Sequence, residues 1–265
     1  MDRVKHIVAV ASGKGGVGKS TTAVNLALAA QALGQRVGLL DADIYGPSIG
    51  MMLGVDPAQR PAPAGDNRLA PVVAHGLQTM SMAYLVTEQT PMVWRGPMAA
   101  GALMQLLEQV AWSELDLLIV DMPPGTGDIQ LTLSQKARLA GAVVVTTPQD
   151  IALLDARKAI EMFNKVSVPV LGVVENMAVH HCSACGHAEA IFGDSGGIAV
   201  AQQYGVPLLG QLPLDIALRS AGDSGAPLSI STPQHPGVES YRTIAGQLIA
   251  ALSSNSSEMP EIVIE

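Results

Sequence analysis

The stretch Gly13-Lys14-Gly15-Gly16-Val17-Gly18-Lys19-Ser20 decides the fold, because it satisfies the pattern G-x-x-x-x-G-K-S. The apolar run His6–Ala11 precedes it and predicts a strand, and a helical pattern begins at Lys19. Glycines allow the backbone to curl so that its N–H groups face phosphate oxygens, and the following helix adds its positive N-terminal end. The pattern therefore predicts a nucleotide phosphate site formed by Gly13, Lys14, Gly15, Gly16, Val17, Gly18, Lys19, Ser20 and Thr21. Lys19 is expected to contact the β- and γ-phosphates, and the Ser20 hydroxyl to bind Mg²⁺.

Short apolar runs alternate with longer helical patterns along the rest of the chain. Predicted strands cover His6–Ala11, Arg36–Asp41, Leu77–Met82, Leu115–Asp121, Ala142–Thr147, Val168–Glu175 and Pro207–Leu212. Predicted helices cover Lys19–Leu33, Met98–Val110, Ile129–Leu139, Ile151–Lys165, Ile198–Tyr204 and Val238–Leu252. This alternation predicts an α/β fold, with a doubly wound and mostly parallel sheet flanked by helices.

Three segments interrupt the alternation: Asp56–Gly76, which is rich in Pro and Ala, Met177–Gly197, which holds both cysteines, and Asp215–Gly237, which is rich in Gly, Pro and Ser. No internal repeat or second core is evident. We therefore predict one domain over residues 1–252, with a cysteine-containing insertion at about 177–197, followed by a polar acidic tail over 253–265.

Composition narrows the class of protein. Of 265 residues, 48% are apolar, which excludes a largely disordered chain. A net charge of −8 argues against a nucleic-acid coat protein. No secretory pattern and no run of about 18 apolar residues are present, so we expect a cytoplasmic protein without a membrane-spanning helix.

Two acidic motifs end predicted strands, where ligands of α/β proteins bind. In Leu118-Ile119-Val120-Asp121, the carboxylate of Asp121 is expected to hold Mg²⁺ through water. The second motif is Asp41-Ala42-Asp43, in which Asp41 is either a direct participant or a structural strand-end residue. The segment Pro123–Asp128 follows Asp121, and its Gly125 N–H is placed to contact a γ-phosphate and report hydrolysis.

The cysteines form the motif Cys182-Ser183-Ala184-Cys185-Gly186, in which both sulfurs can face one ion. Two thiolates are too few for a four-thiolate site, but a symmetric dimer supplies four, which suits a bridging 4Fe-4S cluster. Three other interpretations remain: a zinc site that adds His187 and another ligand, a redox dithiol, and an inert pair.

The second lysine of the loop carries a family resemblance. Lys-Gly-Gly-x-Gly-Lys-Ser resembles the deviant Walker A motif of dimeric ATPases that include nitrogenase iron protein and the partition and septum-site ATPases. The resemblance implies that Lys14 reaches across a dimer to the partner's nucleotide, and that Asp43 positions or activates the attacking water. It also implies that Asn176 contacts adenine and that a loop at Pro213 closes over the base, although a strand-end cap is a second interpretation of Asn176. The implied catalytic residues are Lys14, Lys19 and Asp43.

Over nearly its whole length, from Ile7 to about Leu252, the chain resembles the Mrp/ApbC family of iron–sulfur cluster carrier ATPases. The motifs are the loop, Asp41–Ser48, Trp94–Pro97, Asp121–Asp128, Val174–Met177 and the pair Cys182 and Cys185. The family implies ATP binding, slow hydrolysis, a homodimer, and a labile 4Fe-4S cluster passed from an assembly scaffold to apo-proteins. Many bacterial members carry an additional small N-terminal domain, which we do not expect here. Trp94–Pro97 has no phosphate chemistry, and is expected either to make dimer or partner contacts or to form a surface turn.

Two alternative functions share parts of this pattern. A partition or septum-site ATPase acts on DNA or a membrane, but the acidic tail and acidic net charge favour neither partner. A zinc-stabilised ATPase without a cluster is the second alternative. We expect no nucleic-acid or membrane partner.

Overall fold

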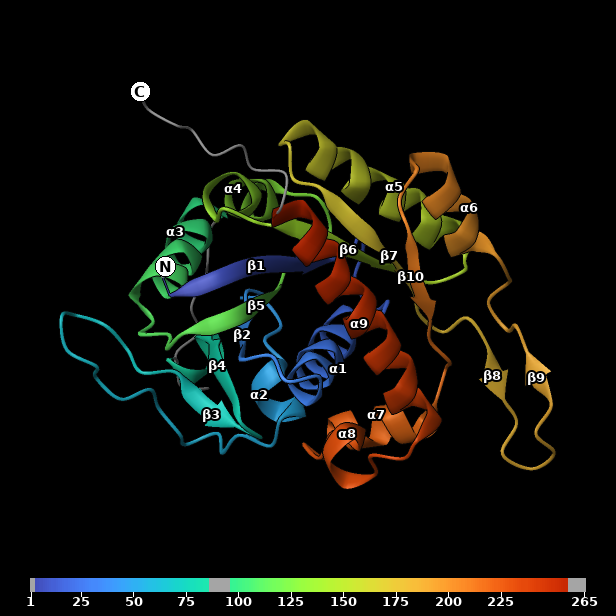
Figure 1. The fold of residues 1–265 in the computed structure, drawn as a ribbon, viewed down its shortest axis with the longest axis horizontal. Helices are drawn as coiled ribbons and strands as arrows, with labels where there is room; N and C mark the ends of the chain where they lie inside the picture. Colours follow the sequence, from blue (N-terminus) through green and yellow to red (C-terminus); the bar gives the residue numbers. More distant parts are fainter. Residues whose placement is uncertain (1–2, 86–95, 257–265) are drawn as a thin grey trace.

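The computed structural model describes residues 3–85 and 96–256. Within them, eight strands form one sheet in the order β10-β7-β6-β1-β5-β2-β4-β3 (Figure 1). The bounds are β1 Val4–Ala11, β2 Val37–Asp41, β3 Val72–Ala74, β4 Leu77–Ser81, β5 Leu115–Asp121, β6 Gly141–Thr146, β7 Val170–Glu175 and β10 Leu208–Gln211. All neighbouring pairs are parallel except β3 with β4.

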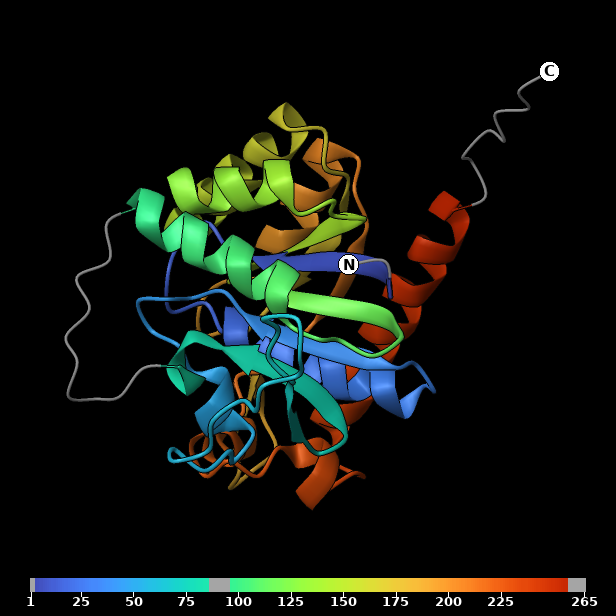
Figure 2. The same ribbon diagram turned by 90° about the vertical axis from the view of Figure 1, so that its left-hand side faces the viewer.

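Helices cover both faces of the sheet, as Figure 2 shows from the side. One face carries α3 Gly96–Gln109, α4 Asp128–Lys136, α5 Asp150–Lys165 and α6 Gly196–Tyr204. The other carries α1 Lys19–Ala32, α2 Ile49–Met52, α7 Ile216–Asp223, α8 Leu228–Ser231 and α9 Pro236–Ser256. A short 3₁₀ helix spans Met82–Tyr84.

The central strands are apolar on both sides because both of their faces are buried. Side chains of β1 alternate between two hydrophobic clusters: Ile7, Ala9 and Ala11 join the cluster with α3 to α6, whereas Val8 and Val10 join the one with α1 and α9. The doubly wound α/β fold expected from the sequence is thereby confirmed.

Each predicted strand and helix is present, with ends that differ by a few residues. Three interrupting segments contain additional elements. The antiparallel edge strand β3 lies in the first, and α7 and α8 lie in the last. The middle one contains a hairpin of β8 (His180–His181) and β9 (Ala188–Glu189), which pair only with each other among the described strands and project from the body (Figure 1). Helix α9 continues into the predicted tail as far as Ser256.

Candidate functional site

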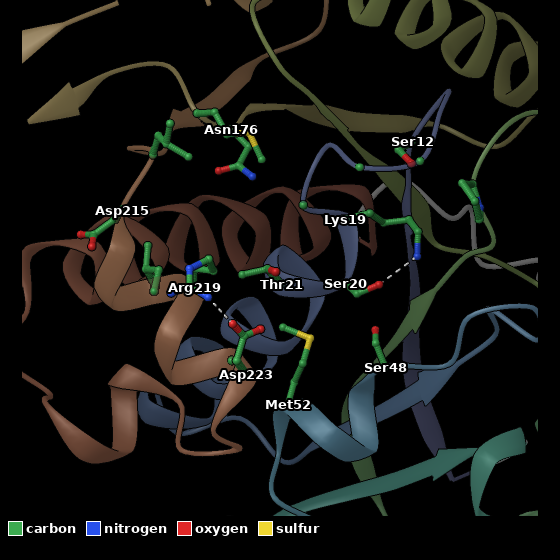
Figure 3. Close-up of a pocket in the computed structure, with 18 of the residues that line it drawn as sticks. Ser12, Lys19, Ser20, Thr21, Ser48, Met52, Asn176, Asp215, Arg219 and Asp223 are labelled. Carbon is green, nitrogen blue, oxygen red and sulfur yellow. Dashed lines mark hydrogen bonds and ion pairs between the residues drawn. The ribbon is translucent and has the colours of Figure 1, made fainter. Parts of the chain in front are cut away.

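A cavity of about 450 Å³ opens at the carboxyl ends of the strands, between the glycine-rich loop and α7 (Figure 3). It contains ten of the site residues predicted from the sequence: Lys14, Gly15, Gly16, Gly18, Lys19, Ser20, Thr21, Asp43, Asn176 and Pro213. These residues come from four separate parts of the chain. The fold therefore assembles most of the predicted nucleotide residues around one space large enough for a small-molecule ligand.

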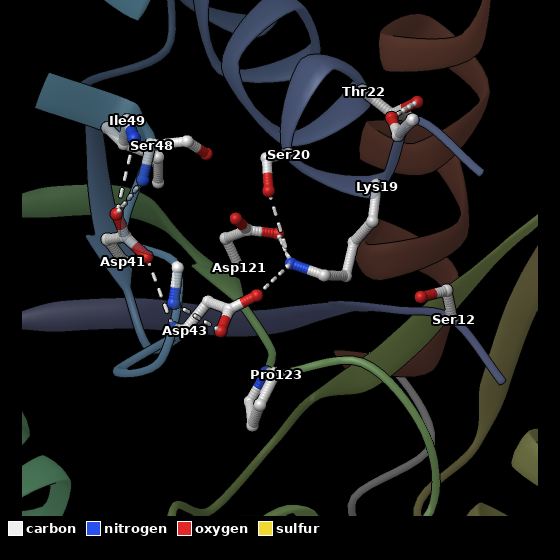
Figure 4. Close-up of polar contacts among 12 residues, drawn as sticks. Ser12, Lys19, Ser20, Thr22, Asp41, Asp43, Ser48, Ile49, Asp121 and Pro123 are labelled. Atoms are coloured by element: carbon white, nitrogen blue, oxygen red, sulfur yellow. Dashed lines mark hydrogen bonds and ion pairs between the residues drawn. The ribbon is translucent and has the colours of Figure 1, made fainter. Parts of the chain in front are cut away.

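Lys19 is the electrostatic centre of this cavity (Figure 4). Its Nζ donates to Asp121 Oδ1 at 2.6 Å and to Ser20 Oγ at 3.2 Å, and lies 3.8 Å from Asp43 Oδ2. Sheet register explains the convergence, because Asp41 at the end of β2 pairs directly with Asp121 at the end of β5. The lysine is 6% exposed, so these charged contacts are largely shielded from water.

The contact with Lys19 uses only one of the two carboxylate oxygens of Asp121. Its side chain is fully buried, and Oδ2 has no hydrogen-bond partner within the described part of the chain. Burial raises the pKa of Asp121 despite the opposing effect of Lys19. Together with Ser20 Oγ, this free carboxylate oxygen is a donor set of the hard oxygen type that Mg²⁺ prefers, so the residues fit that ion.

Asp41 has a structural role in these contacts. Its Oδ1 accepts the Asp43 N–H, and its Oδ2 accepts the N–H groups of Ser48 and Ile49 and the Ser81 hydroxyl (Figure 4). Burial beside Asp121 raises the pKa of Asp41 to about 7. Asp41 therefore fixes the segment that carries Asp43 and begins α2, and it does not line the cavity.

Asn176 contacts the phosphate loop at Val17 and Gly18. Its Nδ2 donates to the Val17 carbonyl at 2.9 Å, which leaves Oδ1 as an acceptor on the cavity side. A Cβ at Gly18 would lie 2.1 Å from that Nδ2, so only glycine permits the contact. Because the amide faces the cavity next to Met177 and Pro213, it is available to a ligand as well as to the loop.

The remaining predicted residues lie around or away from the cavity. Gly13 packs behind the loop against the Asp155 backbone of α5, and Val17 is buried in the core. The Gly125 N–H donates to the Ser12 carbonyl at 3.0 Å. Trp94 and Arg95 lie outside the described residues, and α3 begins at Gly96.

Sequence reasoning missed the far wall of the cavity, which Ser48, Met51, Met52, Leu218, Arg219 and Asp223 line. Arg219 and Asp223 form an ion pair on α7 (Figure 3). Asp215 accepts the Ala217 N–H and so begins α7. An N-cap aspartate followed by Ile216–Asp223 was the available signal, but the surrounding Gly, Pro and Ser residues obscured it.

The cysteines lie apart from the cavity, at the tip of the β8–β9 hairpin. Cys182 N donates to the His187 carbonyl and Gly186 N to the Cys182 carbonyl, which closes a tight turn around the pair. Hydrogen bonds from the Ala184 and Cys185 N–H groups to sulfur lower the pKa of Cys182. The turn thus holds the half-buried Cys182, whose pKa is lowered, next to the exposed Cys185.

Two properties of the described residues bear on the zinc and membrane alternatives. Over residues 3–85 and 96–256, no three His, Cys, Asp or Glu side chains converge as a metal site would require. The zinc site with His187 and a fourth ligand is therefore not assembled within this part of one chain. Among the described helices, none is long and apolar enough to cross a bilayer.

A phosphate loop between β1 and α1, with one carboxylate from the segment after β2 and one from the end of β5 beside its lysine, defines a P-loop nucleoside triphosphatase. The model of the ParA family described as NUBPL iron-transfer P-loop NTPase matches residues 3–249. The chain belongs to this family, which confirms the resemblance found in the sequence.

Named relatives agree with this assignment. The iron-sulfur cluster carrier protein of Pseudomonas fragi is 61% identical over 242 residues, which are 91% of this chain and 84% of the relative. A nucleotide-binding protein from Archaeoglobus fulgidus, solved with ADP, is 37% identical with a TM-score of 0.77, covering 90% of this chain and 92% of its own. The Pyrococcus furiosus cell division ATPase MinD has a TM-score of 0.67 over 92% of this chain and 98% of its own, but at 22% identity it shares the fold alone.

Proposed function

We propose that this protein is an ATP-dependent carrier that binds a 4Fe-4S cluster between two copies of the chain and transfers it to apo-proteins. One observation carries the proposal: a single chain combines a P-loop cavity with a separate hairpin that presents two thiols at the surface. The names of the relatives, iron-sulfur cluster carrier among them, support the same cargo. The positioning alternative has no such support, because its representative shares only the fold.

For ATP, the proposal assigns phosphate contacts to the loop amides and Lys19, and the base to Asn176 and Pro213. Phosphate oxygens would compete for the Lys19 ammonium with Asp121 and Asp43, which are 2.6 Å and 3.8 Å away. Ser20 and Asp121 would hold Mg²⁺, which supplies positive charge next to the phosphates. Asp43 is then free to orient a water molecule, and positioning together with charge stabilisation accounts for a slow hydrolysis.

For the cluster, the proposal uses two thiolates from each chain. Four thiolates are the ligand set of a 4Fe-4S cluster, and one chain supplies two. A homodimer with both hairpins facing each other completes the set. An exposed, shared site also suits cargo that must be released, because either chain can withdraw its ligands without unfolding its core.

The partners that follow are a scaffold that supplies the cluster and apo-proteins that receive it, in the cytoplasm. Both are proteins, and the net charge of −8 makes DNA or an anionic lipid surface an unfavourable partner.

The test is anaerobic reconstitution of the purified protein, followed by iron, sulfide and zinc analysis. We expect about one 4Fe-4S cluster per two chains, loss of iron in the Cys182→Ala/Cys185→Ala variant, and no loss in Ser183→Ala, which alters the exposed residue between them. All three proteins should bind ATP equally, because the hairpin lies outside the cavity. Iron retained by the double variant, or stoichiometric zinc without iron uptake, would overturn the carrier proposal.

A further inference from the structure

The side chain of Gln130, in the first turn of α4, is bound to the loop that follows Asp121. It is 2% exposed, and none of its amide atoms faces the cavity. Its Nε2 donates to the Pro123 carbonyl at 2.5 Å and also to the Gly125 carbonyl, while its Oε1 accepts the Gly127 N–H at 2.6 Å. One buried amide therefore binds three backbone groups within five residues of loop.

The two carbonyls that Gln130 contacts lie on either side of one peptide group. The Pro123 carbonyl belongs to the peptide before Pro124, and the Gly125 carbonyl belongs to the peptide after Gly125. Between them lies the peptide that carries the Gly125 N–H, which now donates to the Ser12 carbonyl of the phosphate loop. Gly125 has a φ of +96°, a conformation that glycine adopts without strain. Gln130 thus holds the peptide before Pro124 and the peptide after Gly125. The Pro124–Gly125 peptide between them can still rotate, because glycine tolerates a wide range of backbone angles.

A glutamine is chemically suited to this task. Its NH₂ group supplies two donors for two carbonyls, and its oxygen supplies the acceptor for an N–H group. Glutamate at the same position preserves the acceptor, and serves equally well at the third position of a helix as the partner of the N-cap amide. It lacks both donors, however, and its charge faces two carbonyl oxygens. Substitution by glutamate therefore separates the helix-capping contact from the loop contacts.

We propose that Gln130 is a positioning residue for the γ-phosphate: by holding the Pro123 and Gly125 carbonyls, it restricts nucleotide-dependent movement of the loop to the Pro124–Gly125 peptide, whose N–H changes partner from the Ser12 carbonyl to the γ-phosphate. This inference rests on the proposed ATPase function and adds a residue that touches neither nucleotide nor metal. It predicts an effect confined to nucleotides that carry a γ-phosphate, because ADP offers that N–H no such partner.

The experiment measures the dissociation constants of AMPPNP and ADP, each with Mg²⁺, for the full chain and its variants by calorimetry. We expect Gln130→Glu to weaken AMPPNP binding by about ten- to a hundredfold, the factor for one hydrogen bond to a charged group. ADP binding should remain within about twofold of the original protein, since the phosphate loop itself is unaltered. The matched control is Gln135→Glu, which adds the same charge at an exposed position on the same helix and should change neither constant.

Several outcomes would overturn the inference. If Gln130→Glu weakens both nucleotides equally, or neither, the residue is only a helix cap. If Gln130→Glu does not fold, the ratio of the AMPPNP and ADP dissociation constants is measured for Gln130→Met, which fills similar space without polar atoms. If neither variant folds, Gln130 serves folding alone and the inference is wrong. Failure of the proposed function looks different, because the unaltered protein would then bind neither AMPPNP nor ADP.

Discussion

The Lys19 ammonium is held between two carboxylates in a site from which water is largely excluded. Its contact with Asp121 at 2.6 Å is the shortest of its charged contacts, and Asp121 is fully buried. A buried carboxylate deprived of its countercharge is strongly destabilising, because the remaining charge has no compensation. Lys19 therefore stabilises the acidic cluster, in addition to its proposed contact with phosphate.

Replacement of Lys19 tests both its contact with phosphate and its effect on stability. We expect Lys19→Ala to lose ATP binding and turnover, measured by calorimetry and phosphate release. Since the folded-state pKa of Asp121 is already raised, its contribution to stability is full at low pH and falls as the pH rises through that pKa. Removing Lys19 raises the pKa of Asp121 further, because the ammonium no longer stabilises the charged carboxylate. In EDTA, the free energy of unfolding measured in urea should therefore fall more between pH 5 and pH 8 for Lys19→Ala than for the unaltered protein. The exposed Lys165→Ala should match the unaltered protein in both assays, and retained turnover in Lys19→Ala would contradict the assignment.

The thiol of Cys182 is predicted to react as a thiolate at lower pH than an ordinary cysteine. The cause is hydrogen bonding from the Ala184 and Cys185 amides, which stabilises the charged form and lowers the pKa of Cys182. Alkylation by iodoacetamide, followed on the Cys182 peptide by mass spectrometry, should therefore reach half of its maximal rate at a lower pH in the folded chain than in urea. Equal pH profiles in both conditions would show that the hairpin turn has no effect on this sulfur.

Residues whose role depends on local backbone chemistry could be identified from the sequence. The glycines and Lys19 of the loop, Asp121, and the two cysteines belong to short motifs with fixed spacing. In the structure, most of the loop lines the cavity, Asp121 contacts Lys19, and both cysteines lie on one hairpin, while their proposed roles stay predictions. Asp41 and Gln130 differ, because most of their partners are backbone groups of the irregular segments next to them in the chain. The path of such a segment is not specified by a motif, so the sequence does not show which of its amides and carbonyls a side chain will reach.

At the scale of elements, the turns that follow α2 and α7 meet through the backbone of two glycines, Gly54 and Gly225. A Cβ built at Gly54 would lie 2.6 Å from the Gly225 carbonyl oxygen, and one at Gly225 would lie 2.6 Å from Gly54 Cα. Both α2 and α7 line the cavity, through Met52 and Leu218 among others. The two walls are therefore in close backbone contact behind the site.

Gly54→Ala tests this contact. The substitution carries the cost of a positive φ, about 1–2 kcal/mol, and adds about 1–3 kcal/mol for the clash. Gly65→Ala is the matched control, since Gly65 also has a positive φ but meets nothing within 4 Å. Urea unfolding should show the larger loss of stability for Gly54→Ala, accompanied by weaker ADP binding. Equal losses in the two variants would mean that the contact can relax at no cost.

The regular elements were predictable because their signals are local. Buried parallel strands are continuous apolar runs, such as Leu117–Val120, and the long helices between them are rich in Ala and Leu. The four-residue helix α2 has no such signal, because its first amides are held by the Asp41 carboxylate from β2. Short elements of this kind are stabilised by the fold and not by their own sequence.

At the scale of the whole molecule, the proposed dimer is testable without a structure of it. Lys14 lines the cavity at its loop end, and the family resemblance assigns it to the nucleotide of the partner. Lys14→Ala and Asp43→Asn should each bind ATP and hydrolyse it poorly. If Lys14 acts across the dimer, a mixed dimer has one complete site, with Lys14 from one chain and Asp43 from the other.

Mixing the two inactive variants in equal amounts should therefore restore about a quarter of the original hydrolysis, since random exchange gives half mixed dimers with one of two sites intact. Phosphate release before and after mixing provides the measurement. Each variant alone at twice its concentration is the control for simple additivity. Absence of any recovery, with exchange demonstrated by differently tagged chains, would place Lys14 in the site of its own chain.

The exposure of the β8–β9 hairpin has a consequence for the substitutions that this chain can accept. Its strands pair only with each other among the described strands, and nearly all of its side chains from His181 to Ala190 are exposed. Substitutions there encounter few packing constraints, whereas changes near Lys19 disturb a buried network of charges. Apart from Cys182 and Cys185, residues of the hairpin should therefore accept substitution with little loss of stability, so the surface around the two thiols can change its shape and charge without altering the buried charges of the cavity.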